Sequence, residues 1–334
     1  MSGPSNLVLP SRQLPAFRAP TRWLEPLPWL LALGVYFVFP DYAPLLTQIF
    51  IMVLFAMSLD LLVGYTGIVT LGHAAQFGTG AYVAGILAVR GLVTDPVLSA
   101  LIAMAAAGLI GLIFGSLMLR TKGLTFLMLS VASGMLLYEI ANKADSVTGG
   151  FDGLQGVSFS PLFKLWEFDF RGTTAFFYSF VLLFLSFIFL RRVVNSPFGW
   201  SLRGIRENDL RMSAVGCQNY RRRLIAYTIA SVLAGLAGAL QAQCTDFVAL
   251  NSLSFESSGG VLIMLILGGS GRLYGPMFGV PIYMIAQDYL SKIDPTNWYI
   301  WQGIILLVLV LFARGGVLTL AERCLHACFR KDAK

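Results

Sequence analysis

The amino-acid sequence predicts an all-α polytopic membrane protein with about ten transmembrane segments. Hydrophobic residues make up 57% of the 334 residues and charged residues only 12%, whereas soluble domains carry about a quarter charged residues. Apolar runs whose length is close to that of a membrane-spanning helix recur along most of the chain. The 34 glycines suit helices that pack closely through small residues.

Polar breaks and Pro/Gly-rich turns separate the apolar runs into expected segments. The first run ends at Pro40, the eighth runs into the glycine-rich stretch 268–271, and both are short for a full span. Because a straight span needs about 20 residues, we expect either run to extend into its flanks or to form a broken helix. The expected segments lie at residues 27–39, 43–63, 68–89, 96–119, 123–141, 174–190, 224–243, 258–269, 276–290 and 299–313.

The lysine and arginine residues indicate how these segments are oriented. With the N-terminus placed inside, most of the 24 lie in pieces that face the cytoplasm, as the positive-inside rule requires. We therefore expect both termini in the cytoplasm, with tails at 1–26 and 314–334 around a transmembrane domain at 27–313. The net charge of +7 follows from this topology and calls for no nucleic acid as a partner.

The longest polar stretch within the transmembrane domain is the cytoplasmic loop 191–223. It holds eight arginines and two acids, Glu207 and Asp209. After a Ser-Pro break, residues 201–215 have the pattern of a short amphipathic helix that Gly216 would end. Such a helix could lie on membrane lipid or dock on a soluble protein. The two acids favour docking, because an anionic membrane surface would repel them.

The longest outer loop is expected at residues 142–173. It contains a turn-rich sequence that suits a structured cap over a pathway, although an ordinary glycine-rich turn is the alternative. The residues of interest in this loop are Thr148, Gly149, Gly150 and Asp152.

A faint internal repeat joins residues 69–80 to residues 248–259. The first stretch opens the third expected segment from the inner face, and the second opens the eighth from the outer face. This arrangement is compatible with an inverted repeat of five plus five segments, which places a pathway at the repeat interface. Chance similarity is the alternative.

Polar residues within apolar segments are candidates for a pathway, since such groups usually face a bundle interior or a cavity. His73 would be a pathway-lining donor or a buried histidine bonded to a carbonyl at a helix start. For Asp60 we favour a structural role, as a cap or an ion-pair partner. For Glu256 we favour stabilisation by the helix dipole over binding of a substrate amine. The candidate pathway residues are Asp60, His73, Gln76, Phe77, Tyr82 and Glu256.

Several chemical motifs are missing from the sequence. It contains no phosphate-binding loop, no zinc-protease motif and no nucleophile elbow, so we expect no catalytic site and no cofactor. Cys324, His326 and Cys328 supply three ligands where zinc normally takes four, and we expect no metal site. Energy for any driven transport would then come from a partner, and the loop 191–223 is the surface that could receive it.

Four sequence motifs resemble the LivM-like permease subunits of branched-chain amino acid ABC importers. The sequence SPFGWSLRGIRENDLRMSAVG is similar to their cytoplasmic coupling loop. LDLLVGYTGIVTLGHAAQFGTGAY, TGGFDGL and SFESSGGVLIMLILGGSGRLYGPMFG resemble three further signatures in the same order. The resemblance covers roughly residues 45–315, and the order of four motifs makes it specific.

The resemblance implies a permease subunit in a bacterial inner membrane, with a second homologous permease as its partner. Two ATP-binding subunits that use ATP and Mg, a periplasmic solute-binding protein and membrane lipid are the other implied partners. Implied substrates are branched-chain or other hydrophobic amino acids; similar importers take urea, short amides or aromatic carboxylates. An autonomous secondary carrier or channel, coupled through His73 and Asp60, is the alternative of another class. The residues implied at the ATPase interface are Arg203, Arg206, Glu207, Asn208 and Gly216.

Overall fold

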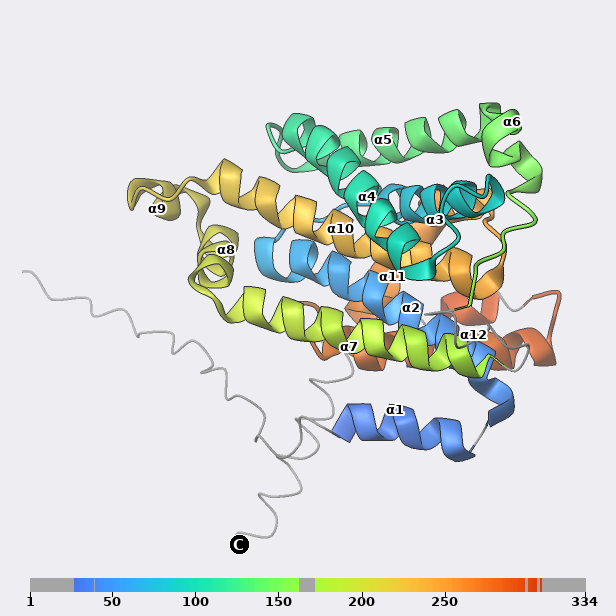
Figure 1. Cartoon of the computed structure of the whole chain (residues 1–334). Coiled ribbons are helices and arrows are strands. Elements are labelled where there is room, and N and C mark those ends of the chain that lie inside the picture. The colour runs from blue at the N-terminus through green and yellow to red at the C-terminus, as the bar shows by residue number, and fades with distance from the viewer. Residues whose placement is uncertain (1–26, 39, 162–171, 298–299, 305–306, 308–334) are drawn as a thin grey trace, which may run out of the picture. The chain divides into compact units, whose positions relative to one another are not determined.

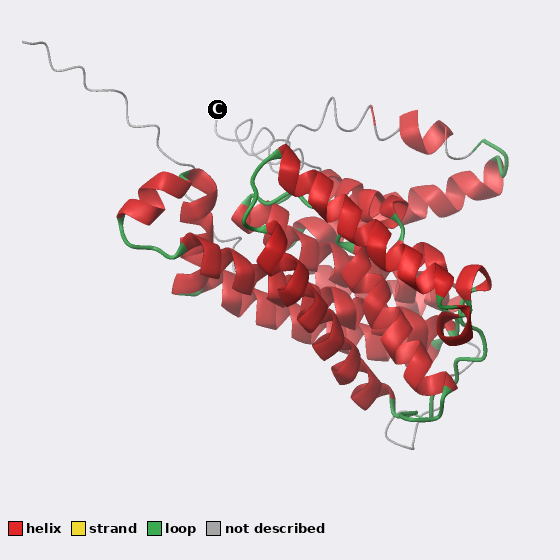
Figure 2. Cartoon of the chain, turned by 90° about the horizontal axis from the view of Figure 1, so that it is seen from above, coloured by secondary structure: helices red, strands yellow, loops and turns green. Residues whose placement is uncertain are grey.

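The computed structural model describes residues 27–38, 40–161, 172–297, 300–304 and 307, and these residues form helices joined mostly by short connections (Figures 1 and 2). No strand is formed within these ranges, where Leu154 and Val248 make one isolated bridge. The all-α prediction is confirmed. The chain divides into two units: Met1–Pro40, which contains α1 (Leu27–Val38), and Asp41–Lys334, which contains the elements described below.

Five helical stretches of the described chain are long and apolar enough to cross a membrane. The first joins α2 (Ala43–Asp60) to a π-helical turn, η2 (Leu61–Thr66). The others are α4 (Pro96–Met118), α5 (Leu124–Lys143), α7 (Thr173–Asn195) and α10 (Asn219–Thr245). Their composition fits a multi-pass membrane protein.

Two further apolar helices are shorter than a full span, α3 (Ala74–Val89) and α11 (Phe255–Gly268), and α12 (Gly275–Ile293) follows. Each expected segment up to 276–290 overlaps a helix. Most of the segment 299–313 and both tails lie outside the described residues. The count of about ten spans and the cytoplasmic termini therefore stay predictions.

Helices α2 and α10 are the most buried of the five long helices. α10 packs against α4, α3 and α2, while α2 also contacts α7, α11 and α12. Glycine permits the close crossing of α3 and α10, because a Cβ on Gly238 would overlap the carbonyl oxygen of Phe77. Gly80 faces the backbone of Gly235 in the same way. The small residues thus set the distance between the two helices.

The loop 191–223 folds into two short helices, α8 (Pro197–Glu207) and α9 (Asp209–Ala214). The single helix expected at 201–215 is wrong, because Asn208 adopts an extended conformation with φ −155° and ψ 101°. Its side-chain oxygen accepts a hydrogen bond from the Arg211 N–H at 2.9 Å and caps α9. Ser196 caps α8, accepting from the Gly199 N–H at 3.4 Å.

The two stretches of the faint repeat have related local structures. In each, irregular backbone leads into a short apolar helix, α3 beginning at Ala74 and α11 at Phe255. The two helix starts are neighbours, because the Ala74 N–H donates to the hydroxyl of Ser258 at 2.9 Å. Broken helices that meet at their N-termini are typical of transporter binding sites. The five-plus-five inverted repeat stays a prediction.

Candidate functional site

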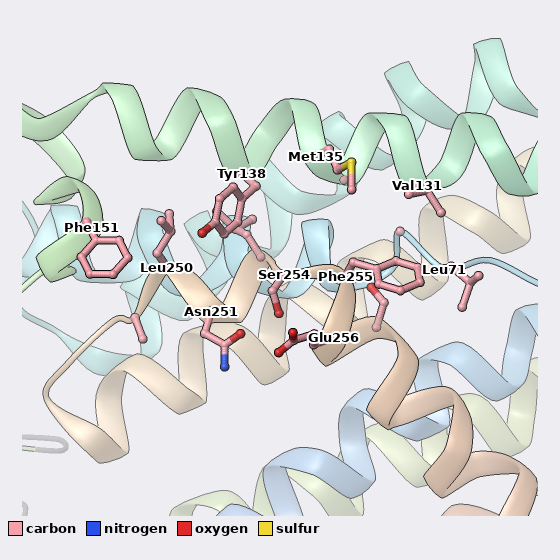
Figure 3. Close-up of a pocket in the computed structure, with 15 residues that line it drawn as sticks. Leu71, Val131, Met135, Tyr138, Phe151, Leu250, Asn251, Ser254, Phe255 and Glu256 are labelled. Atoms are coloured by element: carbon pink, nitrogen blue, oxygen red, sulfur yellow. The ribbon is translucent and has the colours of Figure 1, made fainter. Parts of the chain in front are cut away.

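A cavity of about 500 Å³ lies between α5, the irregular backbone before α3, and the stretch that leads into α11 (Figure 3). In the figure, Val131, Met135 and Tyr138 extend from α5, with Asn251 and Glu256 on the opposite side. Most of its wall is apolar. The larger apolar side chains that line it are Leu71, Val131, Met135, Phe151, Leu250 and Phe255.

Glu256 is the charged residue in this wall, and the described lining contains no lysine or arginine. Its side chain is exposed and makes no hydrogen bond or ion pair within the described part of the chain. The helix cap that an acid at this position could supply comes from Ser254, whose hydroxyl accepts from the Ser257 N–H at 3.1 Å. The carboxylate is therefore available to a ligand.

His73 is fully buried and does not line this cavity. Its Nε2 lies 2.9 Å from the Ser58 hydroxyl, which itself donates to the Phe55 carbonyl at 2.6 Å. Because that hydroxyl proton is already used, Nε2–H must be the donor to Ser58. The ring also stacks on Phe55, with 5.5 Å between centroids. Of the two alternatives for His73, this geometry favours the buried structural histidine, although its partner is a hydroxyl.

Gln76, Phe77 and Tyr82 belong to the packed interior of α3. The Gln76 amide hydrogen-bonds the Tyr227 hydroxyl of α10 at 3.1 Å, and Phe77 stacks on Phe55 at 4.5 Å between centroids. The Tyr82 hydroxyl is buried without a hydrogen-bond partner in the described structure. Among the six candidate pathway residues, Glu256 alone belongs to the described lining of the cavity. Their role in transport stays a prediction.

A second cluster joins α8 to the end of α2. The Arg206 guanidinium donates to the main-chain carbonyl of Gly64 in η2. One turn earlier, the fully buried Asp60 carboxylate accepts the Gly271 N–H at 2.7 Å. Gly64 and Gly271 approach closely, and a Cβ on Gly64 would overlap both the Asp60 carboxylate and the Gly271 backbone. Three segments thus meet at this point: α8, the end of α2, and the turn between α11 and α12.

Side chains on α8 reinforce this contact. Leu202 and Ile205 are 0% and 1% exposed, so the apolar side of the helix is fully covered. The Arg203 guanidinium lies 5.1 Å from the ring centroids of both Tyr65 and Trp200. The arginines expected at a partner interface therefore also hold α8 on its own chain.

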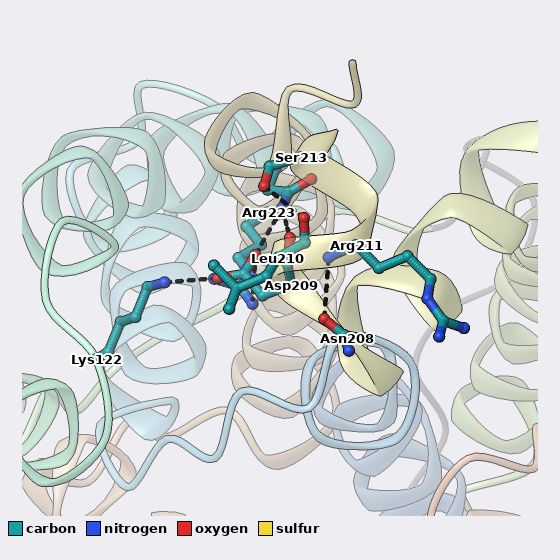
Figure 4. A network of polar contacts seen from close by, with 8 residues as sticks. Lys122, Asn208, Asp209, Leu210, Arg211, Ser213 and Arg223 are labelled. Carbon is teal, nitrogen blue, oxygen red and sulfur yellow. Dashed lines mark hydrogen bonds and ion pairs between the residues drawn. The ribbon is translucent and has the colours of Figure 1, made fainter. Parts of the chain in front are cut away.

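Asp209 anchors α9 in the same region (Figure 4). Its carboxylate pairs with Lys122 at 2.5 Å and with Arg223 at 3.5 Å, and it accepts from the Asn219 amide at 2.6 Å. The hydrogen bond from Lys122 is the main cause that lowers the pKa of Asp209 below its usual 3.8. The Asp209 charge is therefore used internally, whereas the exposed Glu207 has no partner among the described residues.

Two residues of this loop were not identified from the sequence. Leu210 and Val215 are 81% and 80% exposed, next to the half-exposed Cys217 and the fully exposed Gly216 turn. Gly216 has φ +87°, a conformation that glycine adopts without strain. The presence of two apolar residues in a polar loop could have indicated an exposed apolar surface. The expected single helix at 201–215 did not predict that both side chains are exposed. Glu207 is exposed as well, and we refer to the three exposed residues Glu207, Leu210 and Val215 of this loop as the α9 face.

The outer-loop residues form a tight turn beside the cavity. Thr148, in α6 (Asp145–Thr148), donates to the carbonyl of Ala141. Gly149 and Gly150, the latter opening η3 (Gly150–Asp152), have φ of +75° and +56°. Two hydrogen bonds then pin Leu154 to Val248, at 2.9 and 3.2 Å, just before η4 (Leu250–Leu253). Asp152 is exposed, and residues 162–171 of the loop lie outside the described residues.

No group of three or more His, Cys, Asp or Glu residues in the described ranges is placed to hold a metal ion. Cys324, His326 and Cys328 lie outside those ranges, as do the tails at 1–26 and 314–334.

Comparison with known proteins agrees with the family resemblance of the sequence motifs. Residues 42–313 match the family described as branched-chain amino acid transport system, permease component. The high-affinity branched-chain amino acid transport system permease protein LivM of Salmonella typhimurium is 24% identical over 293 residues, which cover 80% of this chain and 68% of that protein. No solved structure matches the chain.

Two further relatives carry similar names. LivM of Escherichia coli is 24% identical over 294 residues, covering 81% of this chain and 68% of that protein. The probable branched-chain amino acid transport permease protein LivM of Methanocaldococcus jannaschii is 25% identical over 271 residues, covering 71% of this chain and 77% of that protein.

Proposed function

Because the chain belongs to the family of branched-chain amino acid transport permeases, we propose that it is the transmembrane permease subunit of an ATP-driven importer. It forms half of the translocation pathway for branched-chain or other hydrophobic amino acids. The observation that carries this proposal is the family match over residues 42–313, which includes the loop 191–223. The chain has no phosphate-binding loop of its own, so ATP and Mg are used by partner subunits.

The proposed complex sits in a bacterial inner membrane. It contains this chain, a second homologous permease, two ATP-binding subunits and a periplasmic solute-binding protein that delivers the substrate. The ATPase subunits dock on the loop 191–223, where Leu210 and Val215 are exposed large apolar side chains and Glu207 is an exposed carboxylate without a partner among the described residues. Exposed apolar side chains within a polar surface are typical of a protein interface. Arg203 and Arg206 hold α8 on its own chain, and Asn208 caps α9.

Closure of the ATPase subunits would then move α8 and α9. The contacts of Arg206 and Asp60 carry that movement to η2 and to the turn that precedes α12. η2 continues α2 directly, and the turn joins α11 to α12, which both contact α2. A rigid, fully packed connection of this kind is what a change of access across a membrane requires.

The solute could also be urea, a short amide or an aromatic carboxylate, as in similar importers. An autonomous secondary carrier or channel is the alternative of another class. For that alternative Asp60 and His73 would have to exchange ions, yet both are fully buried, neither lines the described cavity, and each makes one hydrogen bond to its own chain. Their burial away from the cavity favours the importer.

Co-purification with an ATPase tests the proposal. The gene is expressed together with its neighbouring transport genes, and the tagged chain is purified from membranes. We expect an ATP-binding subunit to co-purify with wild type and to be lost from Glu207→Lys and Leu210→Asp. Asp152→Lys, the same charge reversal on the outer loop, is the control and should retain the subunit. Concentrative uptake by the chain reconstituted alone would contradict the importer and support the carrier.

A further inference from the structure

The loop 191–223 begins with a stretch that carries positive charge alone. Residues 191–206 contain four arginines and no aspartate or glutamate, whereas residues 207–215 contain two acids and one arginine. An anionic partner is attracted to the first stretch, and the acids of the second stretch weaken that attraction there. The α9 face belongs to the second stretch. The two parts of the loop therefore suit different partners.

The first stretch begins where the apolar part of α7 ends. Residues 173–190 carry no charge. At a rise of ~1.5 Å per residue this part is about 27 Å long, close to the ~30 Å thickness of the hydrocarbon core of a bilayer. Arg191 and Arg192 follow directly, and both are exposed. In a bilayer these two arginines therefore lie at the level of the lipid headgroups, on the side that we expect to face the cytoplasm.

Helix α8 adds an exposed tryptophan to the same end of α7. It contacts α7 and begins one residue after that helix ends (Figure 1). Trp200 is 62% exposed, and its ring centroid lies 5.1 Å from the Arg203 guanidinium. Tryptophan is enriched where membrane meets water, because its ring is apolar and its N–H is polar. We call Arg191, Arg192 and Trp200 the α7–α8 corner.

The positive charge of the α7–α8 corner is available to an external anion. Arg192 makes no hydrogen bond or ion pair within the described part of the chain. The acids of the loop come only after residue 206, and one of them, Asp209, is already paired with Lys122 and Arg223. Guanidinium groups match the geometry of phosphate oxygens, to which they can donate two parallel hydrogen bonds.

We propose that the α7–α8 corner binds the headgroup of an anionic phospholipid in the cytoplasmic leaflet. Arg191 and Arg192 donate to its phosphate oxygens, and Trp200 packs against the lipid at the boundary between headgroup and acyl chain. The proposal goes beyond the proposed function, since it needs only this chain in a bilayer. It divides the loop into a part that holds lipid and the α9 face, which remains for a soluble partner.

The competing occupant of the α7–α8 corner is the soluble partner itself. Two observations favour lipid. The corner lies directly at the end of a helix long enough to cross a membrane, and its exposed apolar side chain is a tryptophan. The apolar side of α8 cannot supply the contact with either partner, because Leu202 and Ile205 are buried on their own chain.

Fluorescence quenching by brominated lipid tests the proposal on the purified full chain in nanodiscs of phosphatidylcholine. The chain has six tryptophans, so the Trp200 signal is taken as the difference between wild type and Trp200→Phe. We expect half-quenching of this signal to need at least about fivefold less brominated phosphatidylglycerol than brominated phosphatidylcholine, because each arginine near the surface favours anionic lipid by about that factor. Arg191→Gln/Arg192→Gln should bring the ratio below about twofold.

Two double variants serve as controls. Arg191→Lys/Arg192→Lys keeps both positive charges and should keep most of the preference for phosphatidylglycerol. Arg90→Gln/Lys143→Gln removes two exposed cations from the expected outer ends of α3 and α5. It lowers the net charge by the same amount as the glutamine variant of the corner, and the ratio should stay at the wild-type value.

Four outcomes would overturn the proposal. In the first, both lipids quench the wild-type signal equally. In the second, the ratio is unchanged in Arg191→Gln/Arg192→Gln. In the third, inorganic phosphate removes the preference while sodium chloride of the same ionic strength does not, which would indicate a site for free phosphate. In the fourth, a co-purified ATPase subunit abolishes the quenching, which would assign the corner to the soluble partner. None of these outcomes bears on membership of the permease family.

Discussion

The guanidinium of Arg206 donates a hydrogen bond to the main-chain carbonyl of Gly64 and so connects α8 to the π-helical end of α2. Asp60, one turn before Gly64, accepts a hydrogen bond from the Gly271 N–H at 2.7 Å. An arginine expected to face a partner therefore also makes an internal contact. We expect substitutions of Arg206 and Asp60 to change both stability and coupling.

Arg206→Ala should loosen α8 without removing the α9 face. We expect the free energy of unfolding to fall by about 1.5 kcal/mol or more, because a charged donor is lost from the Gly64 carbonyl. In the assembled importer, ATP hydrolysis should persist while uptake per ATP falls several-fold. Arg211→Ala is the control in the same loop, since Arg211 donates to the Asn208 side chain through its backbone N–H, which alanine keeps. Equal coupling in both variants would contradict the role of Arg206.

Asp60→Ala and Asp60→Asn should differ in their effect on stability. The alanine variant leaves the half-buried Gly271 N–H without an acceptor, which costs about 1–3 kcal/mol. The asparagine variant keeps an oxygen that can accept the same hydrogen bond, so a smaller loss is expected. Thermal unfolding in detergent measures both. If Asp60→Asn lost as much stability as Asp60→Ala, the charge and not the hydrogen bond would be the important feature.

Gly238→Ala should destabilise the crossing of α3 and α10. The added methyl group would overlap the Phe77 carbonyl oxygen, and overpacking of this kind costs about 1–3 kcal/mol. Gly259→Ala is the control, because nothing lies within 4 Å of a Cβ there. Alanine favours a helix over glycine by about 1 kcal/mol, so the control should keep or gain stability. If Gly238→Ala were as stable as wild type, α3 and α10 could move apart at this crossing without a cost in stability, which would contradict this prediction.

Asp209 should make stability depend on acid pH. Its pKa is lowered in the folded protein, chiefly by the hydrogen bond from Lys122, so its contribution is fully present above the unfolded value of 3.8. The contribution is lost as the pH falls through the lower folded pKa. We expect Asp209→Asn to lose about 0.5–1 kcal/mol near neutral pH and to converge with wild type in strong acid. Parallel curves of Tm against pH for the two proteins would contradict this prediction.

The positions of the helices could largely be predicted from the sequence, because membrane segments are long, apolar and interrupted by recognisable breakers. The prediction failed at residues 201–215, where Asn208 can either continue a helix or cap a new one. Asparagine competes with the backbone for hydrogen bonds, and the extended choice depends on α9 being held by Asp209 against Lys122. That ion pair joins residues 87 positions apart, beyond any local pattern.

The sequence by itself determined the fold class and the family resemblance, and it predicts the polar loop as the site for an outside partner, since these depend on composition and on contiguous motifs. The tertiary structure decided which polar side chains are used internally and which remain free. In the structure, His73 hydrogen-bonds Ser58, and Asp60 accepts the Gly271 N–H. Glu256 lines a cavity and has no partner among the described residues. Whether a polar group finds a partner depends on neighbours that are distant in sequence, so only the packing could distinguish Asp60, which accepts the Gly271 N–H, from Glu256, which has no partner among the described residues.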